Sequence, residues 1–212
     1  MKNKRMLFSI IFGILLILLF SFFIYGVNND IFINFDNNIY NFISGNITSG
    51  KTLFYKIITF FGSGLCLFLL ALIILFSFKN KKIGGLTFLN LIIAFLLNAL
   101  VKTIIARPRP EGINIVLESG FSFPSGHTMV SISFYIFLIY LIYKFVNNKA
   151  LKNCLFILIS FLILFIPISR IYLGVHYASD VCGGVILSLI YMCIFYNVFF
   201  DKYNWYLSFL ML

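Results

Sequence analysis

The sequence predicts an all-α, polytopic membrane protein with six transmembrane helices. Of its 212 residues, 62% are hydrophobic, only 10% are charged, and 28 are Phe. A water-soluble domain of this size exposes too much surface to hide so many apolar side chains. Apolar runs long enough to cross about 30 Å of hydrocarbon, roughly 20 residues each, occur six times. Lipid is therefore the solvent that fits this composition.

The six predicted spans follow one another along the chain, separated by polar or basic segments. They lie near 6–26, 53–78, 84–105, 127–146, 151–169 and 176–199. The first span follows the basic segment Met1–Arg5 and has no small-x-small cleavage pattern after it. We therefore expect a retained signal anchor and not a cleaved signal peptide.

Two polar or mixed segments flank these spans. Residues 27–51 are rich in Asn and contain Asn-Asp and Ser-Gly turn signals, and Ile31 to Ile43 are expected to form a short helix in the membrane interface. The tail 200–212, with Trp205 and Tyr206, suits a further interfacial anchor. Because no repeat, linker or second domain is visible, we expect a single transmembrane domain over residues 1–212.

The distribution of basic residues predicts the orientation. If the N-terminus is cytoplasmic, ten of the sixteen Lys and Arg residues fall on the cytoplasmic side and six on the other. Four of those six belong to the candidate site or sit beside it, so the remaining asymmetry is steep and obeys the positive-inside rule. We expect both termini to be cytoplasmic in the plasma membrane, with the loops 106–126 and 170–175 facing outward.

Charge and cysteine patterns exclude other classes of protein. The net charge of +10 comes from short clusters between apolar runs, whereas a nucleic-acid-binding protein would present a continuous basic stripe, so we expect no nucleic-acid partner. The four cysteines form no C-x-x-C pair, which gives no support to a disulfide framework or a zinc site. We expect them to be small buried hydrophobic residues: Cys66, Cys154, Cys182 and Cys193.

Ionisable residues gather at the outer ends of spans 3 to 6. Polar groups at membrane depth are costly and mark function by default. Each one alone has an ordinary structural role, such as snorkelling, helix capping or helix packing, but their position on one side of one bilayer favours a shared site. The set comprises Lys102, Arg107, Arg109, Ser125, His127, Arg170, His176 and Asp180.

The cations of this set predict an anion site. Lys102, Arg109 and Arg170 supply three positive charges, and the forked guanidinium groups suit phosphate oxygens. The backbone N–H groups of Ser125, Gly126 and His127 lie at a predicted helix N-terminus, which attracts anions, and glycine permits close approach. Phosphate is the anion that this pattern fits best.

The chain's two histidines can divide a phosphoryl transfer between them. The i, i+4 spacing puts His176 and Asp180 on one helical face, so that Asp180 can hold one ring nitrogen and leave the other free to attack phosphorus. His127 can protonate the leaving oxygen and later activate water. Since Glu111, Glu118 and Asp180 share no metal-binding motif, we expect a metal-independent enzyme without a cofactor.

Three motifs carry a resemblance to a known family. They are Lys102 with Arg109-Pro110, then Pro124-Ser125-Gly126-His127, then Ser169-Arg170 with His176 and Asp180. In order and spacing the chain resembles the type 2 phosphatidic acid phosphatase superfamily, although many relatives have proline where this chain has Ala178.

The resemblance implies the helical bundle of that family, with His176 as the phosphorylated nucleophile, Asp180 as its partner and His127 as the acid. It further implies that phosphate is bound by Lys102, Arg109, Ser125, Gly126 and Arg170. The roles of Ser169 and Arg107 are less well defined by it. The substrate would be a membrane lipid such as undecaprenyl diphosphate, phosphatidylglycerophosphate or phosphatidate.

Several alternatives stay open at this point. A lipid phosphotransferase would use the same motifs with an acceptor hydroxyl in place of water. A vanadate-dependent haloperoxidase shares the anion site, but the six spans argue against it, and a transporter would place its charges at the midplane or along a pore. The sequence leaves open the lipid, the preference for monophosphate or diphosphate, and the oligomeric state.

Overall fold

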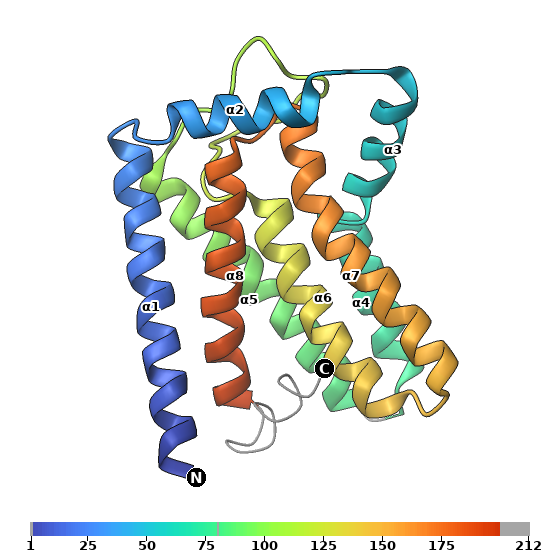
Figure 1. The fold of residues 1–212 in the computed structure, drawn as a ribbon. Helices are drawn as coiled ribbons and strands as arrows, with labels where there is room; N and C mark the ends of the chain where they lie inside the picture. Colours follow the sequence, from blue (N-terminus) through green and yellow to red (C-terminus); the bar gives the residue numbers. More distant parts are fainter. Residues whose placement is uncertain (1, 80, 200–212) are drawn as a thin grey trace.

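The computed structural model describes residues 2–79 and 81–199, with side chains from residue 11 onward. These residues form eight helices and no strand (Figure 1). The predicted anchor at 200–212, with Trp205 and Tyr206, lies outside the described residues. The helices are α1 (Lys2–Asn28), α2 (Ile33–Ser44), α3 (Ser49–Phe60), α4 (Gly64–Ser77), α5 (Lys81–Ile105), α6 (Gly126–Phe145), α7 (Lys149–Tyr172) and α8 (Ala178–Phe199).

The helices confirm the predicted all-α membrane architecture. Within the described residues, α1, α5, α6, α7 and α8 are each long and apolar enough to cross a membrane, and α3 with α4 passes the same test as a pair bent by 46°. Counting the bent pair as one broken span gives the six predicted crossings. The spans run alternately up and down, so the 106–125 loop and the α7–α8 connection lie at the same end of the bundle (Figure 1).

The second span differs from the continuous helix predicted over 53–78, because it breaks at residues 61–63. Polar groups freed by the break find partners: the Ser63 side chain accepts from the backbone N–H of Cys66 at 3.3 Å, and Tyr135 Oη donates to the carbonyl of Phe61 at 2.8 Å. A Cβ on Gly62 would lie 2.6 Å from Ile166 Cγ2. Glycine at the break therefore lets this segment approach α7 closely.

The short helix expected at Ile31–Ile43 is α2, which lies across one end of the bundle over α7 and α8 (Figure 1). Its inner face packs Ile39, Tyr40 and Ile43 against a small buried apolar cluster at the α7–α8 junction. Asp36 lies on the same face and is 3% exposed. An ionisable group buried on the apolar side of an interfacial helix requires polar partners.

The core is centred on α6, which packs against α5, α7 and α8. Phe134, Tyr135 and Phe137 are almost fully buried there, whereas the outward faces of α1, α4 and α5 keep many exposed apolar side chains, as lipid-facing helices do. The prediction that all four cysteines are buried is confirmed for Cys66, holds only in part for the half-buried Cys182 and Cys193, and is wrong for Cys154, which is exposed on α7. The apolar surroundings of a membrane remove the need to bury that side chain.

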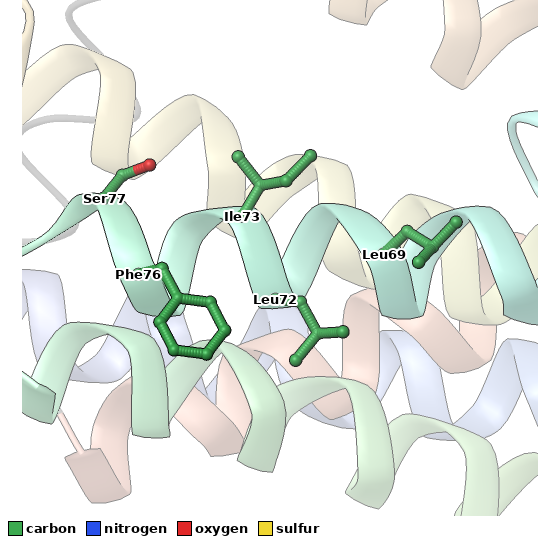
Figure 2. Close-up of a pocket in the computed structure, with 5 residues that line it drawn as sticks. All are labelled: Leu69, Leu72, Ile73, Phe76 and Ser77. Atoms are coloured by element: carbon green, nitrogen blue, oxygen red, sulfur yellow. The ribbon is translucent and has the colours of Figure 1, made fainter.

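An apolar groove lies on α4, lined by Leu69, Leu72, Ile73, Phe76 and Ser77 (Figure 2). It contains no ionisable group, and it occupies the half of α4 that leads away from α3. Such a groove suits acyl chains and offers no groups for chemistry. The polar residues are gathered at the opposite end of the bundle, beneath α2.

Candidate active site

Four helix ends meet at the end of the bundle covered by α2. There α5 and α7 end, and α6 and α8 begin, at Ile105, Tyr172, Gly126 and Ala178. The helix ends position four of the residues predicted for the site: Lys102 and Arg170 lie in last turns, and His127 and Asp180 lie in first turns. His176 occupies the short α7–α8 connection, and Arg109 comes from the 106–125 loop.

His176 is held on both sides of its ring. Nδ1 lies 3.3 Å from Asp180 Oδ2, and Nε2 lies 3.2 Å from Nη1 of Arg109. A guanidinium can only donate, so Nε2 accepts and the ring proton is on Nδ1, directed at the carboxylate. This tautomer leaves a lone pair on Nε2, as a nucleophilic histidine requires.

The surroundings of His176 favour its neutral form. The ring is 3% exposed. Burial lowers the pKa of His176 well below its usual value, and the nearby cations Arg170, Lys102 and Arg109 lower it further. The Nε2 lone pair is therefore available at pH values where an exposed histidine would be protonated.

Arg109 and Lys102 fasten the 106–125 loop over the site. Arg109 donates to three carbonyls: Nε to Gly120 at 3.0 Å, Nη2 to Ser119 at 3.0 Å and Nη1 to Val175 at 2.8 Å. Lys102 Nζ donates to the carbonyl of Phe121 at 3.0 Å. Neutral carbonyls leave the positive charge of both side chains uncompensated, so an anion could still be attracted to them.

Arg170 is 1% exposed and is fixed by partners from two other segments. Its Nη1 donates to Thr59 Oγ1 at 2.7 Å, and its Nη2 donates to Glu118 Oε1 at 2.5 Å. Among the described residues its Nε is a buried donor without a hydrogen-bond partner. A buried guanidinium with an unused donor is suited to an anion that brings further acceptor oxygens.

The start of α6 differs in part from the sequence expectation. The backbone N–H of Ser125, predicted to face an anion, donates to the carbonyl of Asp180 at 3.0 Å, and Ser125 Oγ accepts from Thr128 at 3.0 Å. The N–H groups of Gly126 and His127 belong to the first turn, which precedes the first i→i−4 bond from Met129. These two amides, and not that of Ser125, are the ones suited to an anion.

Close packing surrounds His127 and the residue before it. A Cβ on Gly126 would lie 3.0 Å from Asn98 Oδ1, while Asn98 Nδ2 donates to the carbonyl of Pro124 at 3.3 Å. Glycine here makes room for α5, and Asn98 ties α5 to the residue just before α6. A Cβ on Gly62 would lie 3.5 Å from His127 Cδ2, so the break between α3 and α4 forms one wall beside that ring. His127 is also within electrostatic range of His176.

Sequence reasoning left the role of Arg107 open and missed the supporting roles of Asp36, Glu118 and Thr59. Arg107 Nη1 lies 2.6 Å from Asp180 Oδ1, and its Nη2 lies 2.9 Å from Asp36 Oδ2. Glu118 and Thr59 hold Arg170. A signal for Asp36 did exist, because it stands three, four and seven residues before the apolar positions 39, 40 and 43 and so shares their helical face.

The arrangement offers cations, a nucleophile and an acid–base group, and it offers little to a metal ion. Within 2–79 and 81–199, no group of three or more His, Cys, Asp or Glu side chains is placed to hold one. What the site can do chemically is bind an anion with several oxygens and attack it from His176 Nε2.

Known proteins resemble this chain in sequence and in fold. The family model of the PAP2 superfamily matches residues 84–204. A phosphatidylglycerophosphatase B of Bacillus subtilis (strain 168) is 40% identical over 98 residues, which are 45% of this chain and 47% of that protein, so the chain's match spans about half the length of this curated relative.

Two crystal structures share the fold. The transmembrane PAP2-type phosphatidylglycerolphosphate phosphatase from Bacillus subtilis has a TM-score of 0.79 and 27% identity, covering 91% of this chain and 98% of that one. Aquifex aeolicus LpxE has a TM-score of 0.59 and 28% identity, covering 76% and 93%.

The turn that presents His176 yields a test of the site's packing. Gly174 has φ +71°, and a Cβ there would clash with the backbone carbonyl of Ile113, whereas Gly112 has φ +75° with open space around it. We expect Gly174→Ala and Gly112→Ala each to lose about 1–3 kcal/mol from backbone strain, with a further loss for Gly174→Ala alone. Thermal unfolding in detergent measures both, and equal losses would contradict the proposed clash.

Proposed function

The chain belongs to the PAP2 superfamily, and on that premise we propose that it is a membrane phosphatase acting on a lipid phosphate or diphosphate through a phosphohistidine at His176. One observation carries the proposal: the buried His176 ring, held at Nδ1 by Asp180 and approached at Nε2 by Arg109. A neutral imidazole whose Nε2 lies beside a phosphate-binding guanidinium is placed for in-line attack, once Arg109 exchanges its bond to Nε2 for one to a phosphate oxygen.

In the first step the substrate phosphate replaces the carbonyls bound to Lys102 and Arg109 and the Glu118 carboxylate bound to Arg170. Lys102, Arg109 and Arg170, with the amides of Gly126 and His127, bind its oxygens. The bond from His176 Nε2 to phosphorus forms while the bond from phosphorus to the lipid oxygen breaks, and His127 gives that oxygen a proton. Asp180 stabilises the positive charge that develops on His176. The cations supply the charge neutralisation that loose phosphoryl transfer requires.

In the second step water replaces the lipid. His127, now neutral, takes a proton from the water as its oxygen bonds to phosphorus, and the bond to Nε2 breaks. Inorganic phosphate leaves and the neutral His176 is restored. His127 can serve as acid and then as base because each half-reaction leaves it in the protonation state that the next one requires.

The substrate class is supported by the membrane setting and by the relatives. The site lies at one end of a bundle whose outer faces are apolar, so a headgroup can reach the cations while its acyl chains stay in lipid. Both Bacillus subtilis relatives are named for phosphatidylglycerophosphate, which makes this lipid the leading candidate over undecaprenyl diphosphate and phosphatidate.

The proposed orientation places the site on the extracytoplasmic face of the plasma membrane. The loop over the site carries Arg107 and Arg109, which the network there uses. At the opposite end, Lys79 lies between α4 and α5, and Lys81 and Lys149 are the first residues of α5 and α7. Basic loops stay in the cytoplasm during insertion. Both termini would then be cytoplasmic.

The function is tested by phosphate release from purified protein in detergent. The substrates are phosphatidylglycerophosphate, undecaprenyl diphosphate, phosphatidate and a soluble phosphate ester, each with and without EDTA. We expect one lipid to be turned over fastest, no loss with EDTA, and a loss of about 10³-fold or more in His176→Ala because the nucleophile is gone. Unchanged activity in that variant, or dependence on added metal, would refute the phosphohistidine mechanism.

The low pKa of His176 predicts the acidic limb of the pH profile. A neutral His176 is required for attack, so kcat/KM should stay high below the ordinary histidine pKa of about 6.5 and fall only as pH drops through the lowered value. Arg109→Gln removes one nearby cation, which should move this limb to higher pH. Ionisation of the substrate is common to both enzymes and cancels in the comparison, and a limb that stays in place would contradict this account of the shift.

Glu118 is expected to compete with phosphate for Arg170. Its carboxylate occupies the guanidinium that would bind phosphate, so Glu118→Gln should tighten inhibition by inorganic phosphate, by about tenfold if one charge-assisted bond is released. Glu111→Gln is the matched control, since that carboxylate is exposed on the same loop. Inhibition constants measure the effect, and weaker binding in Glu118→Gln would instead mean that Glu118 orients Arg170 for the substrate.

A further inference from the structure

The buried carboxylate of Asp36 takes no part in the chemistry described above. It is 3% exposed and lies on α2, outside the six spans. Its Oδ1 accepts from the backbone N–H of Ser179 at 2.7 Å, and its Oδ2 accepts from Ser179 Oγ at 2.7 Å and from Arg107 Nη2 at 2.9 Å. Asp36 therefore caps the start of α8 from another helix and holds a guanidinium at the same time.

Arg107 connects Asp36 to Asp180. Its Nη1 lies 2.6 Å from Asp180 Oδ1 and 2.8 Å from Ser179 Oγ, and its guanidinium lies 4.0 Å from the centre of the Tyr177 ring. The other oxygen of Asp180 accepts from the backbone N–H of Tyr177 at 2.9 Å and faces His176 Nδ1. Both oxygens of Asp180 are thus used, and the plane of its carboxylate is fixed relative to the His176 ring.

Neither carboxylate alone would define the position of Arg107. The guanidinium lies between Asp36 and Asp180 with one Nη directed to each, and its stem belongs to a loop that lacks regular structure. With one anchor removed, Arg107 could turn about its bond to the other. The second anchor converts a movable ion pair into a fixed fork.

We propose that Asp36 is a positioning residue for the reaction at His176: through Arg107 it fixes Asp180, so the site is competent only when α2 is docked on α7 and α8. The inference rests on the proposed function for its readout in turnover. Among the described residues, neither Asp36 nor Arg107 forms a bond to a cation that would bind phosphate. Their loss should therefore affect the step that needs an oriented His176 and should spare substrate binding.

The test compares Asp36→Asn, Arg107→Gln and the double variant on the best lipid substrate. Asp36→Asn should lower kcat by about ten- to a hundredfold, as a misplaced catalytic group does, with KM within about twofold of the wild type. Arg107→Gln should lower kcat to a similar extent. The double variant should be no slower than Arg107→Gln, because both substitutions break the same chain of contacts from Asp36 through Arg107 to Asp180. Ser179→Ala keeps both charges and should cause a smaller loss.

Asp30→Asn is the matched control, since Asp30 is an exposed carboxylate in the turn before α2, and asparagine tolerates its φ of +57°. Its kcat should equal that of the wild type. A rise in KM at unchanged kcat for Arg107→Gln would make Arg107 a phosphate ligand and overturn the proposal. Additive losses in kcat for the double variant, or a lowered melting temperature with unchanged kcat in Asp36→Asn, would overturn it as well.

A readout without turnover separates this inference from the proposed function. The chain has two histidines, so protein labelled with ¹⁵N-histidine gives two sets of ring signals, assigned with His127→Gln. Asp36→Asn and Arg107→Gln should shift the Nδ1 signal of His176 in the same direction, and Asp30→Asn should leave it in place. If these shifts occur but the wild type hydrolyses no lipid, the positioning role holds and the proposed function fails; if the wild type is active and the signal does not move, the positioning role fails.

Discussion

The rest of the site depends on the interactions that hold the carboxylate of Asp180. It is fully buried, and burying an isolated charge costs several kcal/mol. Four groups from two segments bind this one residue: Arg107 and the amide of Ser125 from the 106–125 loop, and His176 and the amide of Tyr177 from the α7–α8 connection; the Ser125 amide bonds to its backbone carbonyl. The need to compensate one buried charge therefore fixes the loop between α5 and α6 against α8, and the bond to the backbone carbonyl of Asp180 fixes the start of α6.

The cations face the reverse problem, because a site built for phosphate must stay folded without it. Lys102 and Arg109 are tied to loop carbonyls, which orient them without neutralising them. Arg170 is the most deeply buried of the three, and it is also the one with a carboxylate partner, Glu118. The more deeply buried a cation is, the more strongly it is bound by its partner in the absence of phosphate. The positive charges therefore stay preorganised for a ligand.

Much of this could be predicted from the sequence, because charged residues at the ends of apolar runs mark both the helix boundaries and the site. Lys102, Arg109, His127, Arg170 and Asp180 lie where that reasoning placed them. His176 is predicted to share a helical face with Asp180, but it lies in the connection before α8 and meets Asp180 there. The missing parts depend on long-range geometry. Periodicity shows that Asp36 shares a face with Ile39, but not that this face meets Arg107, 71 positions away. The break at residues 61–63 and the engagement of the Ser125 amide likewise depend on contacts with Tyr135 and Asp180.

The division of the chain between these roles has a physical logic. The family model begins at residue 84, and every group proposed to touch phosphate lies within its range. The N-terminal part supplies Thr59 to Arg170 and Asp36 to Arg107. A phosphate ligand must match both the shape and the charge of the substrate, whereas a supporting group needs only to return a hydrogen bond or a charge at one point. Many different segments could supply such a supporting group, but the fold must supply one. A buried guanidinium without its partner would be free to turn, and the carboxylate beside His176 would turn with it. For that reason α2 and α3 belong to the active site as much as to the membrane anchor, although none of their side chains is proposed to touch the substrate.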